Sequence, residues 1–225
     1  SEHYQSEALE RTHRWAKRSL DHHKKLSSLP RQSASSPHLS ALFGIVQGGR
    51  SEKLRKESAT YIGSLDFDGF GIGGSFEKED MEKAVQWVNE ILPKEKPRHL
   101  LGIGEPLDLF MAVEKGCDLF DCVAPTRLGR NGGVYTGGGK VNLFNQEFRG
   151  DLKPIDDDCA CYTCKNFSRG YVSHLFHSKE MLAGVLASIH NIYFITNLVK
   201  KMREEILSGD FEKYKKEFLE RYYKN

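Results

Sequence analysis

The sequence predicts an α/β protein in which helices cover a parallel sheet and a smaller helical subdomain follows. Three observations lead to this prediction. Short apolar runs alternate with amphipathic stretches of helical length, the pattern of parallel strands joined by crossover helices. Glycine or polar residues follow each apolar run. A Cys-x-Cys-x-x-Cys cluster then introduces a last part that has its own apolar spacing.

The composition is that of an ordinary soluble globular chain of 225 residues, with 39% hydrophobic and 28% charged residues. The net charge of +2 means that any nucleic-acid binding must come from local clusters. No apolar run approaches the roughly 20 residues of a membrane span, so no membrane partner is expected. Five cysteines, three of them close together, favour a metal site in the cytoplasm over disulfides. The chain starts without methionine inside a helical pattern, which indicates a fragment.

The elements are expected in the following order. A helix over 6–26 precedes a Ser/Pro-rich loop over 27–38. Ser51 is a suitable N-cap for the next helix, and Pro93 ends the one after it. The strands are expected at 42–46, 67–72, 99–103 and 119–123, and the helices between them at 51–62, 78–92 and 106–115.

The residues at the strand ends indicate the architecture. They are Gln47-Gly48-Gly49, Gly73-Gly74, Gly102 to Glu105, and Asp121. In a (β/α)8 TIM barrel the active site lies at the carboxyl ends of the strands. Four strands cannot close a barrel, so residues 1–128 are interpreted as its C-terminal half, and the other half is expected before Ser1.

Residues 129–225 are interpreted as a second domain. A glycine-rich hairpin over 132–142 and the cysteine cluster are followed by mostly helix from about residue 178. Cys159, Cys161 and Cys164 can supply three thiolates to one structural Zn²⁺. The fourth ligand is then one of His174, His177 and His190. The alternative is a set of reduced cysteines without metal.

The carboxylate of Asp121 is the first catalytic candidate, as a nucleophile or general base at a strand end. It could instead cap a turn or pair with Arg127. Arg127 and Arg130 follow in what reads as a basic loop, where they could clamp phosphate or be solvated.

Gln47 and Gly73-Gly74 are candidates for binding a nucleobase. The amide of Gln47 offers a donor and an acceptor, and the two glycines allow close approach to bare N–H groups. Tight turns at the strand ends are the alternative in both cases.

Together these residues resemble one family, the tRNA-guanine transglycosylases or queuine tRNA-ribosyltransferases. The resemblance runs along essentially the whole chain. It rests on the segments Arg14–Ser19, Phe43–Gly49, Gly71–Gly74, Leu101–Gly104, Phe120–Arg127, Gly129–Gly132 and Cys159 to Asn191.

The resemblance implies exchange of the wobble guanine of a tRNA anticodon for a 7-deazaguanine base, queuine or its precursor. Asp121 would attack the ribose C1′ and form a covalent ribosyl-enzyme. The family pattern selects His190 as the fourth zinc ligand, with one structural zinc per chain. Base binding would fall to Gln47, Gly73, Gly74, Leu101 and Gly102, and tRNA binding to Thr126, Arg127, Arg130 and Asn131.

The resemblance also sets expectations about partners and departures. It implies a homodimer, or a heterodimer with a related subunit, and an acid/base aspartate upstream of this chain, so that the chain alone would be inactive. The segment from Ser75 to Lys78 departs from the family pattern, which leaves the identity of the incoming base open. Glu105 replaces a residue that is often basic. The alternatives are a non-catalytic tRNA-binding paralogue or partner subunit, and a phosphate-binding barrel of unrelated chemistry.

Overall fold

The computed structural model describes residues 2–27, 40–74 and 78–224. It divides into two compact units, of which the first comprises residues 1–103 and 111–121 and the second 104–110 and 122–225. The loop predicted over 27–38 lies outside the described residues except for Ser27. Ser75 to Glu77, which differ from the family pattern, also lie outside them.

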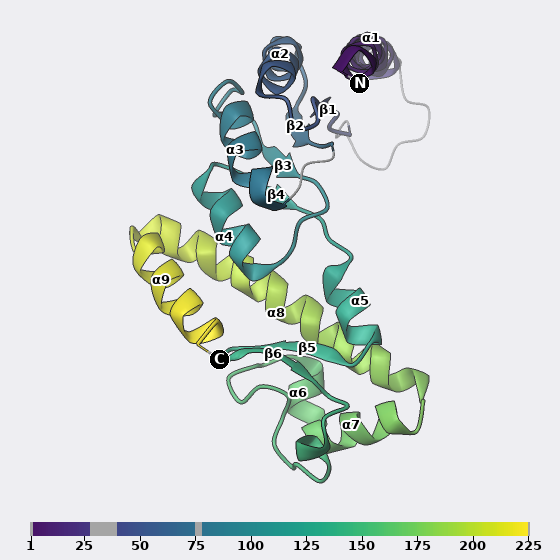
Figure 1. Ribbon diagram of the computed structural model, residues 1–225, viewed down its shortest axis with the longest axis vertical. Helices are drawn as coiled ribbons and strands as arrows, with labels where there is room; N and C mark the ends of the chain where they lie inside the picture. Colours follow the sequence, from purple (N-terminus) through teal and green to yellow (C-terminus); the bar gives the residue numbers. More distant parts are fainter. Residues whose placement is uncertain (1, 28–39, 75–77, 225) are drawn as a thin grey trace. The chain divides into compact units, whose positions relative to one another are not determined.

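The first unit is built on a parallel sheet, as the sequence predicts (Figure 1). Neighbouring strands pair in chain order, with β1 and β4 at the two edges. The last two strands are shorter than predicted and end at Leu100 and Phe120, because the chain turns at Gly102, which has a φ of 77°, and after Asp121. The strands are β1 (Phe43–Val46), β2 (Gly69–Ile72), β3 (Arg98–Leu100) and β4 (Leu119–Phe120).

Helices follow the strands at the predicted places. Ser51 is the predicted N-cap, since its side chain accepts a hydrogen bond from the Leu54 backbone N–H at 3.4 Å. The third helix ends at Asn89, three residues before the predicted end, and turns lead from it to Pro93. The helices are α1 (Glu2–Ser27), α2 (Glu52–Gly63), α3 (Lys78–Asn89) and α4 (Pro106–Glu114).

The two faces of the sheet differ in burial. Side chains alternate between faces along a strand, and Val46, Ile72 and Leu100 are fully buried in one core with residues of the helices, such as Ile62 and Val88. The odd-numbered positions share the opposite face, which is less buried on β3 and β4. That face continues into the residues predicted to form the site.

The second unit contains the predicted hairpin and more helix than predicted. The chain is helical from Ala124 to Arg130, where a basic loop was predicted. Two short helices also precede residue 178, the predicted start of the helical part. Its elements are α5 (Ala124–Arg130), β5 (Gly133–Thr136), β6 (Gly139–Asn142), the 3-10 helix η1 (Gln146–Phe148), α6 (Tyr162–Asn166), α7 (Arg169–His177), α8 (Met181–Ser208) and α9 (Phe211–Tyr222).

Helix α8 organises the second unit. Its 28 residues are long and apolar enough to match a membrane span by composition, a match that the sequence analysis did not expect. One side of the helix nevertheless lies in the protein interior, where Leu186, His190 and Met202 are almost fully buried. Within this unit α8 packs against α5, α7 and α9, which is the behaviour of a core helix.

Candidate functional site

Four of the six residues predicted to bind the base and the ribose lie in one row across the sheet. Val46 is in register with Ile72, Ile72 with Leu100, and Leu100 with Phe120. The next residue on each chain segment therefore projects from the other face, at the carboxyl ends of the strands. That row consists of Gln47, Gly73, Leu101 and Asp121.

The side-chain amide of Gln47 lies against the two glycines that follow β2. A Cβ atom on Gly73 would lie 3.2 Å from Gln47 Nε2, and one on Gly74 only 2.7 Å from Gln47 Oε1. Gly74 also has a φ of 94°, a conformation that only glycine adopts easily. A side chain at position 74 would therefore displace the Gln47 amide, so the close packing of this amide requires glycine.

A buried arginine that was not among the predicted site residues joins the two loops. Arg55 donates from Nε to the Gly49 carbonyl at 2.7 Å and from Nη1 to the Gly73 carbonyl at 3.0 Å. Burial lowers the pKa of Arg55 to about 10, so the guanidinium stays charged at neutral pH. The helical spacing of the sequence could have indicated that Arg55 is buried, because Arg55, Ala59 and Ile62 share the buried face of α2.

The carboxylate of Asp121 is held at one of its oxygens. Oδ1 accepts a hydrogen bond from the Gly102 backbone N–H at 3.1 Å and lies 3.0 Å from Nε2 of His99. The side chain is 60% exposed, so it remains accessible to a ligand. Gly102 was predicted to belong to the site, whereas His99 was not.

The predicted tRNA-binding residues lie on or next to a short helix. The prediction of a loop here was wrong, because residues 124–130 form α5. Pro125 lies in the first turn of this helix, where its missing N–H costs nothing. Thr126 Oγ1 donates to the Val123 carbonyl at 3.2 Å, and the Asn131 amide donates to the Arg127 carbonyl at 2.8 Å. Arg127 and Arg130 are exposed on its last turn. The helix thus offers two guanidinium groups to solvent, while Thr126 and Asn131 bond to its ends.

The three cysteines and His190 come together in the second unit. His190 Nδ1 lies 3.6, 3.5 and 3.3 Å from the sulfur atoms of Cys159, Cys161 and Cys164, and all four atoms lie within 4.8 Å of one another. Tetrahedral zinc with ordinary bond lengths places sulfur and nitrogen ligands roughly 3.5 Å apart. The cluster can therefore hold one zinc ion. Of the three candidate histidines, His190 is the one in the cluster.

The surroundings of His190 fix the ring for this role. Its Nε2 lies 2.6 Å from the Tyr135 carbonyl oxygen, so the proton belongs on Nε2 and the lone pair on Nδ1 faces the thiols. Hydrogen bonds from Cys159 and Cys164 hold the pKa of Cys161 far below its usual range, as suits a thiolate ligand. His190 is fully buried, and four protein ligands leave no open position. The geometry fits a structural metal.

Asn191 links the same turn of α8 to the hairpin. Its Oδ1 accepts from the Tyr135 N–H at 3.0 Å, and its Nδ2 donates to the carbonyls of Pro125 and Gly133, both at 3.0 Å. The pair His190-Asn191 thus connects the metal cluster, β5 and the start of α5.

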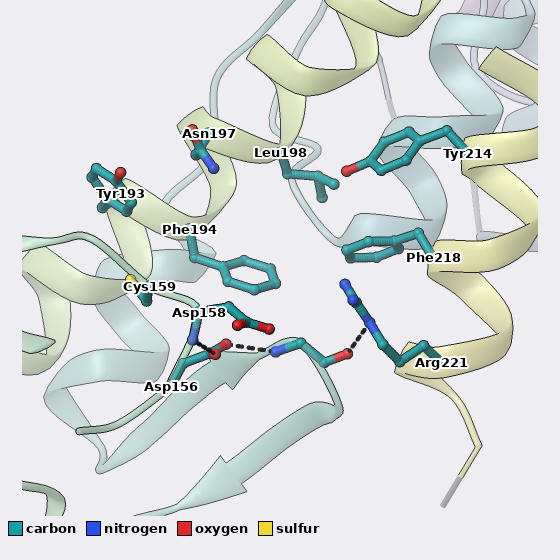
Figure 2. A pocket seen from close by; sticks show the side chains of 11 residues that line it. Asp156, Asp158, Cys159, Tyr193, Phe194, Asn197, Leu198, Tyr214, Phe218 and Arg221 are labelled. Atoms are coloured by element: carbon teal, nitrogen blue, oxygen red, sulfur yellow. Dashed lines mark hydrogen bonds between the residues drawn. The ribbon is translucent and has the colours of Figure 1, made fainter. Parts of the chain in front are cut away.

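Cys159 of the cluster also lines a small pocket, which Figure 2 shows. It has a volume of about 140 Å³ and is lined by Cys159 and by aromatic side chains of α8 and α9. Asp156 accepts from the Gly137 N–H at 2.6 Å, and Arg221 donates to the Gly137 carbonyl at 3.0 Å. These bonds tie the hairpin tip to the cysteine loop and to α9, so the polar groups of this pocket serve the fold.

Glu105 replaces a residue that is often positively charged in the family. Its side chain contacts other residues of the second unit. Its carboxylate lies 2.6 Å from Lys140 Nζ and accepts from the Tyr135 hydroxyl at 3.4 Å. Burial raises the pKa of Tyr135, which keeps that hydroxyl protonated. The acidic side chain therefore binds the hairpin.

Comparisons with known proteins show which family the chain resembles. Residues 1–224 match the family described as queuine tRNA-ribosyltransferase. A relative from Archaeoglobus fulgidus is 46% identical over 96% of this chain and 53% of its own length. The queuine tRNA-ribosyltransferases of Caldanaerobacter subterraneus and Francisella tularensis are each 44% identical, over 99% and 96% of this chain and 57% and 56% of their own lengths.

These matches identify the family. An α/β protein with a carboxylate at a strand end and a Cys3His cluster is the class that the structure defines. The chain belongs to the queuine tRNA-ribosyltransferase family. It spans about half the length of the curated relatives that it matches.

Proposed function

We propose that this chain supplies the nucleophile, the base pocket and the zinc subdomain of a tRNA-guanine transglycosylase. The observation that carries the proposal is the row of Gln47, Gly73, Leu101 and Asp121 along one sheet edge. It sets an amide, an open backbone and an apolar side chain beside one accessible carboxylate. Base recognition and attack on the attached sugar need these groups together.

The reaction follows from the carboxylate. Asp121 attacks the ribose C1′ of the target nucleotide, and guanine leaves with the electrons of the broken C1′–N9 bond and takes up a proton. The incoming 7-deazaguanine gives up the corresponding proton when its N9 attacks C1′ and releases Asp121. Two displacements retain the configuration, as in retaining glycosidases.

Recognition of the base uses the rest of the row. The amide of Gln47 offers a donor and an acceptor to the base edge, and the Gly74 N–H, free of any side chain, is suited to the exocyclic carbonyl oxygen. Leu101 packs against the plane of the base. Arg55 sets the spacing of the two loops by binding a carbonyl in each.

The tRNA itself would be held by α5. Arg127 and Arg130 are suited to contact the anticodon backbone, so that the target base can be splayed out of its stack. Thr126 and Asn131 support the helix that carries them. We place this reaction in the cytoplasm.

The architecture and assembly complete the proposal. Parallel strands in chain order with β1 and β4 at open edges fit one half of a (β/α)8 barrel, with the boundary to the zinc subdomain near residue 128. Zinc, when bound by the three cysteines and His190, fixes the second unit and takes no part in the reaction. A homodimer, or a heterodimer with a related subunit, is proposed as the working form.

The test is base exchange in the full-length protein. We expect the wild type to incorporate labelled guanine into tRNA and Asp121→Asn to lose this activity. An Asp121→Asn variant that exchanges guanine at the wild-type rate would overturn the assignment. Binding of tRNA without any exchange in the wild type would instead support the second candidate, a non-catalytic partner subunit.

A further inference from the structure

We propose that His99 is a positioning residue for Asp121: its imidazole holds Oδ1 of the carboxylate so that the second oxygen attacks the ribose. The inference rests on the proposed function, since it assumes that Asp121 is the nucleophile. It adds an ionisable group that neither the sequence pattern nor the comparisons assign.

The contact itself is the first observation. Nε2 of His99 lies 3.0 Å from Oδ1 of Asp121, within ion-pair distance, although its angle does not meet that of a hydrogen bond. The Gly102 N–H reaches the same oxygen at 3.1 Å. Among the described residues no hydrogen bond to Oδ2 is found. One oxygen is thus held twice, and the other is left for a substrate.

The sheet register explains how the ring reaches the carboxylate. His99 lies on β3, paired with Gly71 on one side and Leu119 on the other. All three positions share the face that carries the site. Gly71 has no side chain, and a Cβ there would lie 2.6 Å from Ile45 Cδ1, so the side chain of Ile45 covers β2 on this face. Because Gly71 and Leu119 are uncharged, Asp121 is the charged partner that faces His99 from the adjoining strands.

The environment of the two groups differs in a useful way. The His99 side chain is 26% exposed and its Nε2 is buried, whereas Asp121 is 60% exposed. A ring fixed within the sheet can restrict an otherwise mobile carboxylate. Small errors in the placement of a reacting group can reduce a rate about 100-fold, so such restriction has kinetic value.

The chemistry of the imidazole gives the contact a signature in variants. A neutral ring can offer one N–H to the carboxylate. Phenylalanine lacks this donor, and the side-chain amide of glutamine restores one.

Two variants of the full-length protein test the proposal. His99→Phe keeps the ring size and loses the donor, whereas His99→Gln keeps an N–H donor at similar reach. We expect His99→Phe to form the covalent adduct about 10- to 100-fold more slowly in a single turnover, with an unchanged KM for tRNA. His99→Gln, which keeps a donor, should stay within about threefold of wild type.

The controls separate this inference from the proposed function. His22→Phe makes the same change on the exposed side of α1 and should behave as wild type. Equal melting temperatures exclude unfolding as the cause. A wild type without any exchange would remove the proposed function itself. If the wild type exchanges base and His99→Phe forms the adduct at the wild-type rate, the role of His99 is refuted while the role of Asp121 stands.

Discussion

The row of site residues on the sheet and the cysteine cluster in the second unit are built in opposite ways. The cluster gathers three ligands from six consecutive positions and closes around a fully buried His190. The row takes one residue from each of four chain segments far apart in sequence, and its carboxylate is largely exposed. A structural site can be local and closed, whereas the row proposed to bind a base depends on strand register and stays open.

The largest expected effect concerns the closed site. Cys161→Ala, or removal of metal by a chelator, should reduce zinc from one ion per chain to none and loosen the helices after residue 178. Structural zinc contributes about 10 kcal/mol or more to the folding of small domains, so protease resistance in this region should collapse. Metal analysis and limited proteolysis measure both effects.

The matched control for the zinc prediction is Cys122→Ala. Cys122 lies outside the cluster, so this variant should keep its zinc and its resistance to protease. Unchanged melting of Cys161→Ala, or wild-type protein purified without chelator that contains no zinc, would contradict the assignment.

A smaller effect is expected at Arg55, whose guanidinium binds the two loops next to the row of site residues. Arg55→Met leaves the carbonyls of Gly49 and Gly73 without their buried donor. An unsatisfied buried group costs about 1–3 kcal/mol, so a loss of roughly 2–4 kcal/mol in unfolding free energy is expected, with weaker binding of guanine. Denaturant unfolding and guanine titration are the measurements.

The same helix provides the control for Arg55. Lys53 is exposed on α2, and Lys53→Met should change stability by less than about 0.5 kcal/mol. If Arg55→Met were as stable as Lys53→Met and bound guanine normally, the hydrogen bonds of Arg55 would have no role in stability or in base binding.

The smallest expected effect is at Gly74. Gly74→Ala places a Cβ where Gln47 Oε1 now lies, at a φ of 94°. The strain amounts to roughly 1–2 kcal/mol, and the shifted amide should raise the KM for guanine about tenfold while the KM for tRNA stays constant. Gly138→Ala, where a Cβ meets nothing within 4 Å, is the matched control. Equal guanine KM values for both variants would refute the proposed role of Gly74 in binding the base.

The comparison also explains what the sequence could predict. The cysteine spacing is local, so three zinc ligands could be predicted directly, while His190 lies in the middle of a long helix and needed the family resemblance. The site residues that follow the strands were predicted because each comes after an apolar run, although β3 and β4 end earlier than predicted. His99 and Arg55 were missed because their partners, Asp121 and two glycine carbonyls, are set by register and helix packing rather than by spacing.

The segment after Asp121 shows how packing changes a local reading. Its glycine and basic residues indicate a loop, yet it forms α5. A Cβ on Gly129 would lie 2.8 Å from the Ser188 backbone nitrogen, so this glycine permits close contact with α8 rather than a turn. Tertiary contacts of this kind outweigh single-residue propensity.

The central claim is that Asp121 forms a covalent bond to the ribose. The direct measurement is to trap full-length protein on tRNA with a guanine analogue, digest the adduct and locate the modified peptide by mass spectrometry. We predict a ribosyl group on the peptide that contains Asp121, and none on that peptide in Asp121→Asn. A stable adduct on any other residue, or one that survives Asp121→Asn, would contradict the account.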